Sequence, residues 1–465
     1  MTIDLVNSLF FVNIIFIGFI GFVLLLKFWE WLPVILLPLI WYLPSWTSPG
    51  GPLVHIRIIR WFMILIIPFL YIIQLGRNIK FRQRLELTII ARPLLALSFV
   101  AVLSAMLNAS GFINMLGYLA LFLQYPLFFV ILMNIELSDT VVVWFIKLFL
   151  FLTFIQVPEI IFRYLTMGIV GDTVSLTLGI YGHYNIGIFS LYTIALITAH
   201  SLTAGFSPLY IMACLLLLLC SLIGEIKIVV ISAPVIIIVI VFLFLNKQLS
   251  QDLDISRYVN KFIIGLLSIA LLLPIYTSWG KVQSGQRNSL GRFFDNIYGV
   301  ISGTKQFTRK QIYDINRIGV FVEVWDVLKN NSIRLLFGYG PGSTFAGNFF
   351  GTPGRFFAGV MKLKAAGGKM LPQIPATLGD VGFIGLLVYF WIYALLFKCL
   401  VSSYLHAKDR FYEILILGSF GIWVFYVILG PIYNIVWRSE MASYLFYFFM
   451  AVACRQKARS DDAQG

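Results

Sequence analysis

Long uninterrupted apolar runs recur along most of this 465-residue chain, and they limit its fold more than any other feature. Each run has about 18 to 22 residues, which as a helix is enough to cross a hydrocarbon layer of roughly 30 Å. Hydrophobic residues make up 60% of the chain and charged residues only 12%, and the mean hydropathy is +0.93. A water-soluble fold cannot bury that much apolar surface. The chain is therefore predicted to be a polytopic membrane protein.

We expect an all-α bundle of about 12 to 13 transmembrane helices, each satisfying its own backbone hydrogen bonds in the bilayer. The expected spans are 7–26, 30–47, 60–76, 87–107, 111–134, 140–160, 184–203, 207–223, 226–245, 260–278, 379–400, 411–430 and 437–454.

Basic clusters in the short loops predict which side of the membrane each loop faces. Cytoplasmic loops are enriched in lysine and arginine, and the clusters lie at 77–84, 398–410 and 455–459. Alternation from these loops places one long segment, 279–372, on the outer face. The predicted organisation is thus N-terminal spans in 1–278, the outer loop 279–372, C-terminal spans in 373–454 and a cytoplasmic tail, 455–465.

The outer loop is strongly basic. It contains thirteen lysines and arginines against four acidic residues, a net charge of +9. Long loops are translocated regardless of charge, so this loop does not contradict the topology. Its cations suggest an anionic ligand, such as a lipid pyrophosphate or an acidic glycan, or contact with anionic headgroups. The net charge of +14 for the whole chain is explained by topology, and no nucleic-acid partner is expected.

Two features stand out within this loop. Residues 311–329 have apolar positions spaced by threes and fours, which predicts an amphipathic helix lying on the membrane or capping a cavity. A glycine-rich motif follows, with Gly338, Gly340 and Gly342, whose backbone can turn tightly or approach a ligand closely. An ordinary turn explains the same motif.

Ionisable residues near the ends of spans are candidates for function, because charge is costly in a membrane. Glu225 and Lys227 lie between two apolar runs, either as functional residues or as an interfacial hairpin with snorkelling side chains. His183 begins one span and Asp380 another. The four cysteines have no spacing typical of a metal site, and no cofactor or metal is expected.

In its layout the chain resembles the superfamily of O-antigen ligases and O-antigen or capsular polysaccharide polymerases, over roughly residues 180–400. The resemblance is carried by Gly-His-Tyr-Asn at 182–185, the charged break at 224–227, Arg317 and Trp325 before Phe337-Gly-Tyr-Gly-Pro-Gly342, and Gly379-Asp-Val-Gly-Phe-Ile-Gly385. Members are glycosyltransferases of the GT-C fold in the bacterial inner membrane, with a periplasmic active site, and they act on undecaprenyl-pyrophosphate-linked sugars.

The resemblance implies a metal-independent transfer in which cations stabilise the leaving pyrophosphate and a polar group orients the attacking hydroxyl. The expected pyrophosphate-binding residues are Arg317, Lys227, Arg287 and Arg292. The expected residues on the hydroxyl side are Glu225, His183 and Asp380. The expected partners are lipid-linked oligosaccharide, membrane lipids and a chain-length regulator.

Two departures from the ligase pattern favour a polymerase. The charged break reads Glu225-Ile226-Lys227 where many ligases have Ser-Arg-Gly, and no histidine precedes the next span around Pro372. A ligase acting on a lipid acceptor stays an alternative within this class. Outside it, the alternatives are a polysaccharide transporter or flippase, which predicts internal repeats, and a non-catalytic membrane scaffold.

Overall fold

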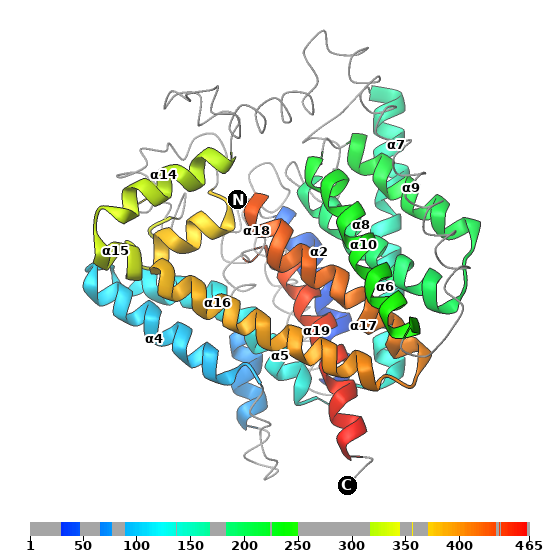
Figure 1. Ribbon diagram of the computed structural model, residues 1–465, viewed down its shortest axis with the longest axis horizontal. Helices are drawn as coiled ribbons and strands as arrows, with labels where there is room; N and C mark the ends of the chain where they lie inside the picture. Colours follow the sequence, from blue (N-terminus) through cyan, green and yellow to red (C-terminus); the bar gives the residue numbers. More distant parts are fainter. Residues whose placement is uncertain are drawn as a thin grey trace, which may run out of the picture.

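The computed structural model is helical throughout the residues that it describes, and no strand occurs among them (Figure 1). These residues are 29–46, 66–76, 89–135, 137–167, 183–223, 226–249, 317–344, 356, 371–433, 437 and 439–462. A helix satisfies its N–H and C=O groups internally, which is what apolar surroundings without water require. The predicted all-α class is confirmed for this part of the chain.

The first half contains, in chain order, the 3-10 helix η1 (Trp29–Trp31), α2 (Leu32–Trp46), a helix at Ile66–Gly76, α4 (Ala91–Leu107), α5 (Phe112–Met133), α6 (Asp139–Phe154), α7 (Gln156–Met167), α8 (His183–Ala204), α9 (Pro208–Ile223) and α10 (Lys227–Leu249). The second half contains α14 (Arg317–Lys329), α15 (Ser332–Phe337), α16 (Gln373–His406), α17 (Arg410–Trp423), the π-helix η4 (Val424–Leu429), α18 (Gly430–Tyr433) and α19 (Glu440–Asp462).

Within the described ranges, 6 helical segments are long and apolar enough to cross a membrane. They are Phe112–Met133, Asp139–Thr166, Asn185–Ala204, Ile231–Gln248, Gln373–His406 and Arg410–Ile432. Every expected span except 7–26 and 260–278 coincides with a helix, and those two lie outside the described residues. The prediction of a polytopic helical membrane protein is thus supported, while the full number of spans stays a prediction.

Three helices differ in detail from the expected spans. The span expected at 140–160 is divided into α6 and α7, because Pro158 has no N–H to donate to the carbonyl one turn earlier. α16 begins at Gln373, before the expected span, and breaks at Gly382. α19 continues to Asp462, so most of the expected tail is helical.

The centre of the bundle is formed where α17 packs against α8 and α10. Glycines on α17 permit this close approach. A methyl group added at Gly418 would lie 2.8 Å from Leu196 Cδ2 on α8, and one at Gly421 would lie 2.7 Å from Ile236 Cγ2 on α10. Inside a membrane the hydrophobic effect does not drive helices together. Small residues let the backbones approach closely, so that van der Waals contacts hold the helices together.

The helix predicted at 311–329 is confirmed for its described part, α14. Val324 and Leu328, one turn apart, are buried in a small cluster with Phe356 and Leu371, which anchors α14 beside the start of α16. Trp325 on the other face stays exposed.

Polar contacts hold together the ends of α8, α10, α16 and α17. Lys247 Nζ of α10 lies 2.8 Å from Glu413 Oε1 of α17, and its ammonium group also lies over the Tyr404 ring. Arg410 Nε donates to the carbonyl of Thr203 at the end of α8, at 3.1 Å. The expected alternation places all these ends on one side of the membrane, and the contacts agree with it. Which side is cytoplasmic stays a prediction.

The Lys247–Glu413 pair leads to a first prediction. Lys247→Ala should lower the free energy of unfolding by about 1–3 kcal/mol, because the Glu413 carboxylate would stay partly buried without its partner. The measurement is the unfolding midpoint of purified protein in detergent. Lys408→Ala is the matched control, since Lys408 is exposed near the same end. Equal midpoints for the two variants would contradict the prediction.

Candidate functional site

The glycine motif forms a loop that packs against a break in α16. We call residues Gly338–Thr344 the glycine loop. Gly338, Gly340 and Gly342 have φ angles of +72°, +101° and +76°, and Gly382 in α16 has a φ of +68°. These lie in the left-handed region, which glycine adopts without a steric penalty. The backbone conformation therefore explains the glycines of both motifs.

The loop supplies hydrogen bonds that the break in α16 removes. A non-helical residue at 382 interrupts the ladder of helical hydrogen bonds, so the carbonyls just before it need other donors. The Tyr339 N–H donates to the Gly379 carbonyl at 2.7 Å, and the Gly340 N–H donates to the Asp380 carbonyl at 3.1 Å. The loop is thus joined to α16 backbone to backbone.

The two backbones approach so closely that a side chain would not fit between them. A methyl group at Gly338 would lie 2.6 Å from the carbonyl carbon of Asp380, and one at Gly382 would clash with the Leu336 carbonyl. Gly338 and Gly382 are needed so that the glycine loop and α16 can touch. This contact explains both glycines, and no ligand is needed to explain them.

The Asp380 side chain fastens the end of the loop. It is fully buried. Its Oδ1 accepts from the Ser343 hydroxyl at 3.1 Å and from the Thr344 N–H at 2.8 Å, and its Oδ2 accepts from the Thr344 hydroxyl at 2.8 Å. Both carboxylate oxygens are engaged in holding the loop, so this environment favours a positioning role. The catalytic role expected for Asp380 stays a prediction.

α4 completes the arrangement with two polar side chains. The Ser104 hydroxyl contacts the carbonyl oxygens of Phe337 and Asp380, at 2.5 and 3.2 Å. Asn108 Nδ2 donates to the Gly338 carbonyl at 3.2 Å. We call this junction of α4, the glycine loop and the break in α16 the loop clasp.

The clasp leaves few backbone donors for a ligand. The N–H groups of five residues in and beside the loop are bonded within the protein, namely those of Gly338, Tyr339, Gly340, Ser343 and Thr344. A phosphate-binding loop instead directs several N–H groups at its ligand. The glycine loop therefore has the hydrogen bonding of a structural clasp.

The other predicted site residues are placed as follows. His183, Lys227 and Arg317 are the first residues of α8, α10 and α14. Glu225, Arg287 and Arg292 lie outside the described residues.

Three of the predicted residues lie in two separate places, His183 and Lys227 in one and Asp380 in the other. The starts of α8 and α10 lie together, because a methyl group at Gly187 would be 2.7 Å from Ile226 Cγ2. His183 and Lys227 therefore begin neighbouring helices. In Figure 1, α8 and α10 lie to the right of the centre, whereas α15 and the adjoining part of α16 lie at the left. The structure thus separates the clasp, with Asp380, from the second group, His183 and Lys227.

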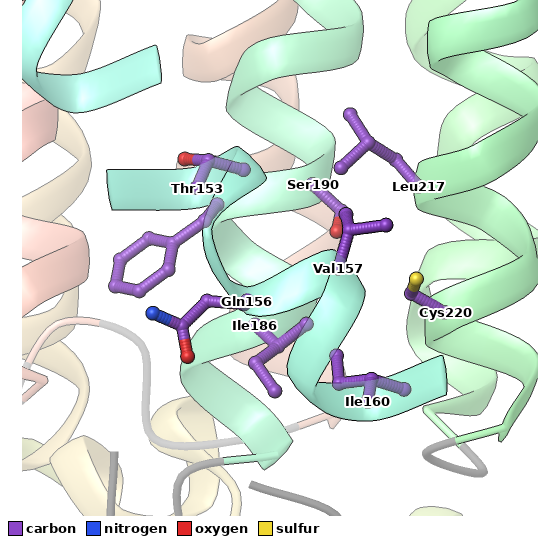
Figure 2. Close-up of a pocket in the computed structure, with 9 residues that line it drawn as sticks. Thr153, Gln156, Val157, Ile160, Ile186, Ser190, Leu217 and Cys220 are labelled. Atoms are coloured by element: carbon purple, nitrogen blue, oxygen red, sulfur yellow. The ribbon is translucent and has the colours of Figure 1, made fainter. Parts of the chain in front are cut away.

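A small gap lies beside the second group, between α7, α8 and α9 (Figure 2). It contains about 210 Å³ of empty space, but no part of it is wide enough for a water molecule. Figure 2 shows Ser190 and Val157 meeting at its centre, with Cys220 facing them from α9. The Ser190 hydroxyl has no hydrogen-bond partner among the described residues. The gap is too narrow to be a substrate site.

The polar residues of α4, together with Ser343 and Thr344, were not among the residues predicted from the sequence. A signal for Ser104 and Asn108 exists, because they lie one helical turn apart at the end of a mainly apolar span, and such residues often bond across helices. Within the described ranges, no three His, Cys, Asp or Glu residues are grouped so as to hold a metal ion.

A search of known protein-family models found no match to this chain, and a search of curated proteins found no relative. A functional assignment therefore depends on the residues, their geometry and the resemblance in layout.

The glycine contacts lead to a second prediction. Gly382→Ala and Gly340→Ala should each lower the free energy of unfolding by about 2–5 kcal/mol, through backbone strain and steric overlap. The Gly340 methyl would overlap Ser110 Oγ. Gly111→Ala is the control, because Gly111 has a φ of −58° and its added methyl would lie 4.0 Å from Asn114 Nδ2. Thermal unfolding in detergent measures all three, and similar midpoints would contradict the prediction.

Proposed function

We propose that this chain is a polymerase of bacterial surface polysaccharide in the inner membrane. It transfers a glycan from undecaprenyl pyrophosphate to a hydroxyl of a lipid-linked repeat unit, at the periplasmic face. The observation that supports this most is the loop clasp. The two most specific motifs of the resemblance, the glycine loop and the entry to α16, are far apart in sequence and meet in direct contact.

The reaction breaks the bond between the anomeric carbon of the donor glycan and the pyrophosphate oxygen. A new bond forms between that carbon and the acceptor hydroxyl oxygen, the hydroxyl proton passes to a base, and undecaprenyl pyrophosphate departs with the bonding electrons. Preorganised cations stabilise the negative charge that develops on the leaving group. The proposed cations are Lys227 and the three arginines at 317, 287 and 292.

The position of Lys227 suits it to an anionic substrate. It is the first residue of α10, after the non-helical Ile226, where the partial positive charge of the helix dipole adds to that of a cation. His183 and Glu225 are the proposed proton acceptors. Asp380 is proposed to position the loop.

The binding of pyrophosphate leads to a third prediction. Arg317→Ala and Lys227→Ala should each reduce polymer at least about 100-fold, because each removes a cation from the charge developing on the leaving group. The test uses cells in which this chain is the only polymerase. Polymer length is read on gels, and chain level by immunoblot.

Lys329→Ala is the control, because Lys329 lies at the other end of α14 and is paired with Asp326 at 2.6 Å. Normal polymer in both Arg317→Ala and Lys227→Ala would overturn the assignment. The product also separates the alternatives. A lengthened chain still on its carrier indicates a polymerase, polymer on another lipid indicates a ligase, and uncoupled movement of repeat units indicates a flippase.

The role of Asp380 gives a fourth prediction. If Asp380 positions the loop, Asp380→Asn and Thr344→Val should lower the unfolding free energy by about 1–3 kcal/mol each, since both disrupt the hydrogen bond from the Thr344 hydroxyl to Asp380 Oδ2. Both should then retain turnover in purified, folded protein at saturating substrate. Loss of turnover in Asp380→Asn alone, with its unfolding midpoint kept, would instead identify Asp380 as the proton acceptor.

A further inference from the structure

Arg334, an exposed residue of α15, has a guanidinium group that the glycine loop holds in place. Its Cζ lies 4.5 Å from the centre of the Tyr339 ring, and its Nη1 donates to the Tyr339 hydroxyl at 3.2 Å. The Tyr339 ring in turn packs on Phe356, with centroids 4.9 Å apart, and its backbone belongs to the clasp. A cation stacked on an aromatic ring loses part of its rotational freedom before any ligand arrives.

This guanidinium is not ion-paired, unlike two lysines in the described part of the chain. Lys329, the nearest of them in sequence, pairs with Asp326, and Lys247 pairs with Glu413. Arg334 has no carboxylate partner among the described residues, and its side chain makes one hydrogen bond there, to Tyr339. An arginine side chain has five N–H donors. Most of the donors of Arg334 therefore remain available to a ligand.

Contacts with α4 place Arg334 near the end of an expected membrane span. Phe337 and Gly338, at the end of α15, contact Ser104 and Asn108 in the last turn of α4. α4 has 17 residues, about 25 Å of helix, which nearly spans a hydrocarbon layer of roughly 30 Å. The expected span 87–107 ends beside these contacts, and on that expectation the end of α15, one turn from Arg334, lies at the edge of the layer, where headgroup phosphates begin.

The exposed apolar side chains around Arg334 agree with this depth. Ile333 and Leu336, on either side of it in α15, are 57% and 41% exposed. Met106 in the last turn of α4 is 75% exposed. Apolar residues beside an exposed arginine are typical of a segment that rests at a membrane interface.

We propose that Arg334, held by Tyr339, binds a lipid-borne phosphate group at this edge of the membrane. A guanidinium group fits two phosphate oxygens with parallel hydrogen bonds, and the Tyr339 ring limits the positions that the group can take. The phosphate belongs either to an anionic phospholipid or to a polyprenyl diphosphate. The second source rests on the proposed function, in which Arg334 joins the cations that hold the donor lipid.

The test is a fifth prediction and uses the full chain in nanodiscs. One arm compares the thermal unfolding midpoint in phosphatidylglycerol and phosphatidylcholine nanodiscs. The other titrates farnesyl diphosphate into phosphatidylcholine nanodiscs and follows the same midpoint. Wild type should be stabilised in at least one arm. Arg334→Gln should abolish the phosphatidylglycerol effect or raise the farnesyl diphosphate concentration needed at least about 10-fold, and Arg334→Lys should restore it only in part.

Lys329→Gln is the matched control, because it removes the same charge from a neighbouring exposed and ion-paired position. It should behave as wild type. A response confined to phosphatidylglycerol identifies a phospholipid, and one confined to farnesyl diphosphate identifies the diphosphate carrier. The proposal is overturned if the midpoint of the wild type responds to neither lipid. It is also overturned if, in both arms, the response of Arg334→Gln equals that of the wild type or of Lys329→Gln.

The assay measures binding without turnover, so it separates this proposal from the proposed function. A chain that makes no polymer and still shows the Arg334 dependence would overturn the polymerase and leave the phosphate site in place.

Discussion

The break in α16 at Gly382 leaves two backbone carbonyls without helical partners, and the surrounding elements are organised around satisfying them. Such groups are expensive wherever water is scarce. The glycine loop and α4 supply the donors, so a non-helical position in one helix determines where α15, the loop and the end of α4 must lie. The same hydrogen bonds thus stabilise the break in α16 and position α15, the glycine loop and the end of α4.

The clasp also bears on how residues 317–344 take part in the proposed chemistry. It provides no phosphate cradle of its own, because its N–H groups are used internally. It holds Arg334 over the Tyr339 ring and fixes one end of the hairpin formed by α14 and α15. The starts of α8 and α10, which include His183 and Lys227, lie at a distance from it (Figure 1). A donor lipid with a long glycan is large enough to contact separate regions of this kind.

Much of the fold could be predicted from the sequence, because a run of apolar residues long enough to span a bilayer has only one way to satisfy its backbone. The segment at 140–160 shows the limit, since the break before Pro158 moved a helix boundary. The sequence shows the glycine motif at 337–342 and the motif at 379–385 as two separate features. Their contact was not predictable, because hydrogen bonds between residues more than thirty positions apart leave no local pattern. The positions of Ser104 and Asn108 were overlooked, since single polar residues in an apolar span have many roles.

The contacts of Ser104 have a consequence for how the chain is made. Its partners Phe337 and Asp380 follow it by 233 and 276 residues. At a synthesis rate of about 5–20 residues per second, α4 waits roughly 10–60 s in the bilayer before its partners leave the ribosome. During that interval Ser104 and Asn108 depend on temporary partners, such as their own helix, water or an insertion factor. The clasp therefore forms only after α5 to α10 have been synthesised, whereas α17 and α19 are made after it.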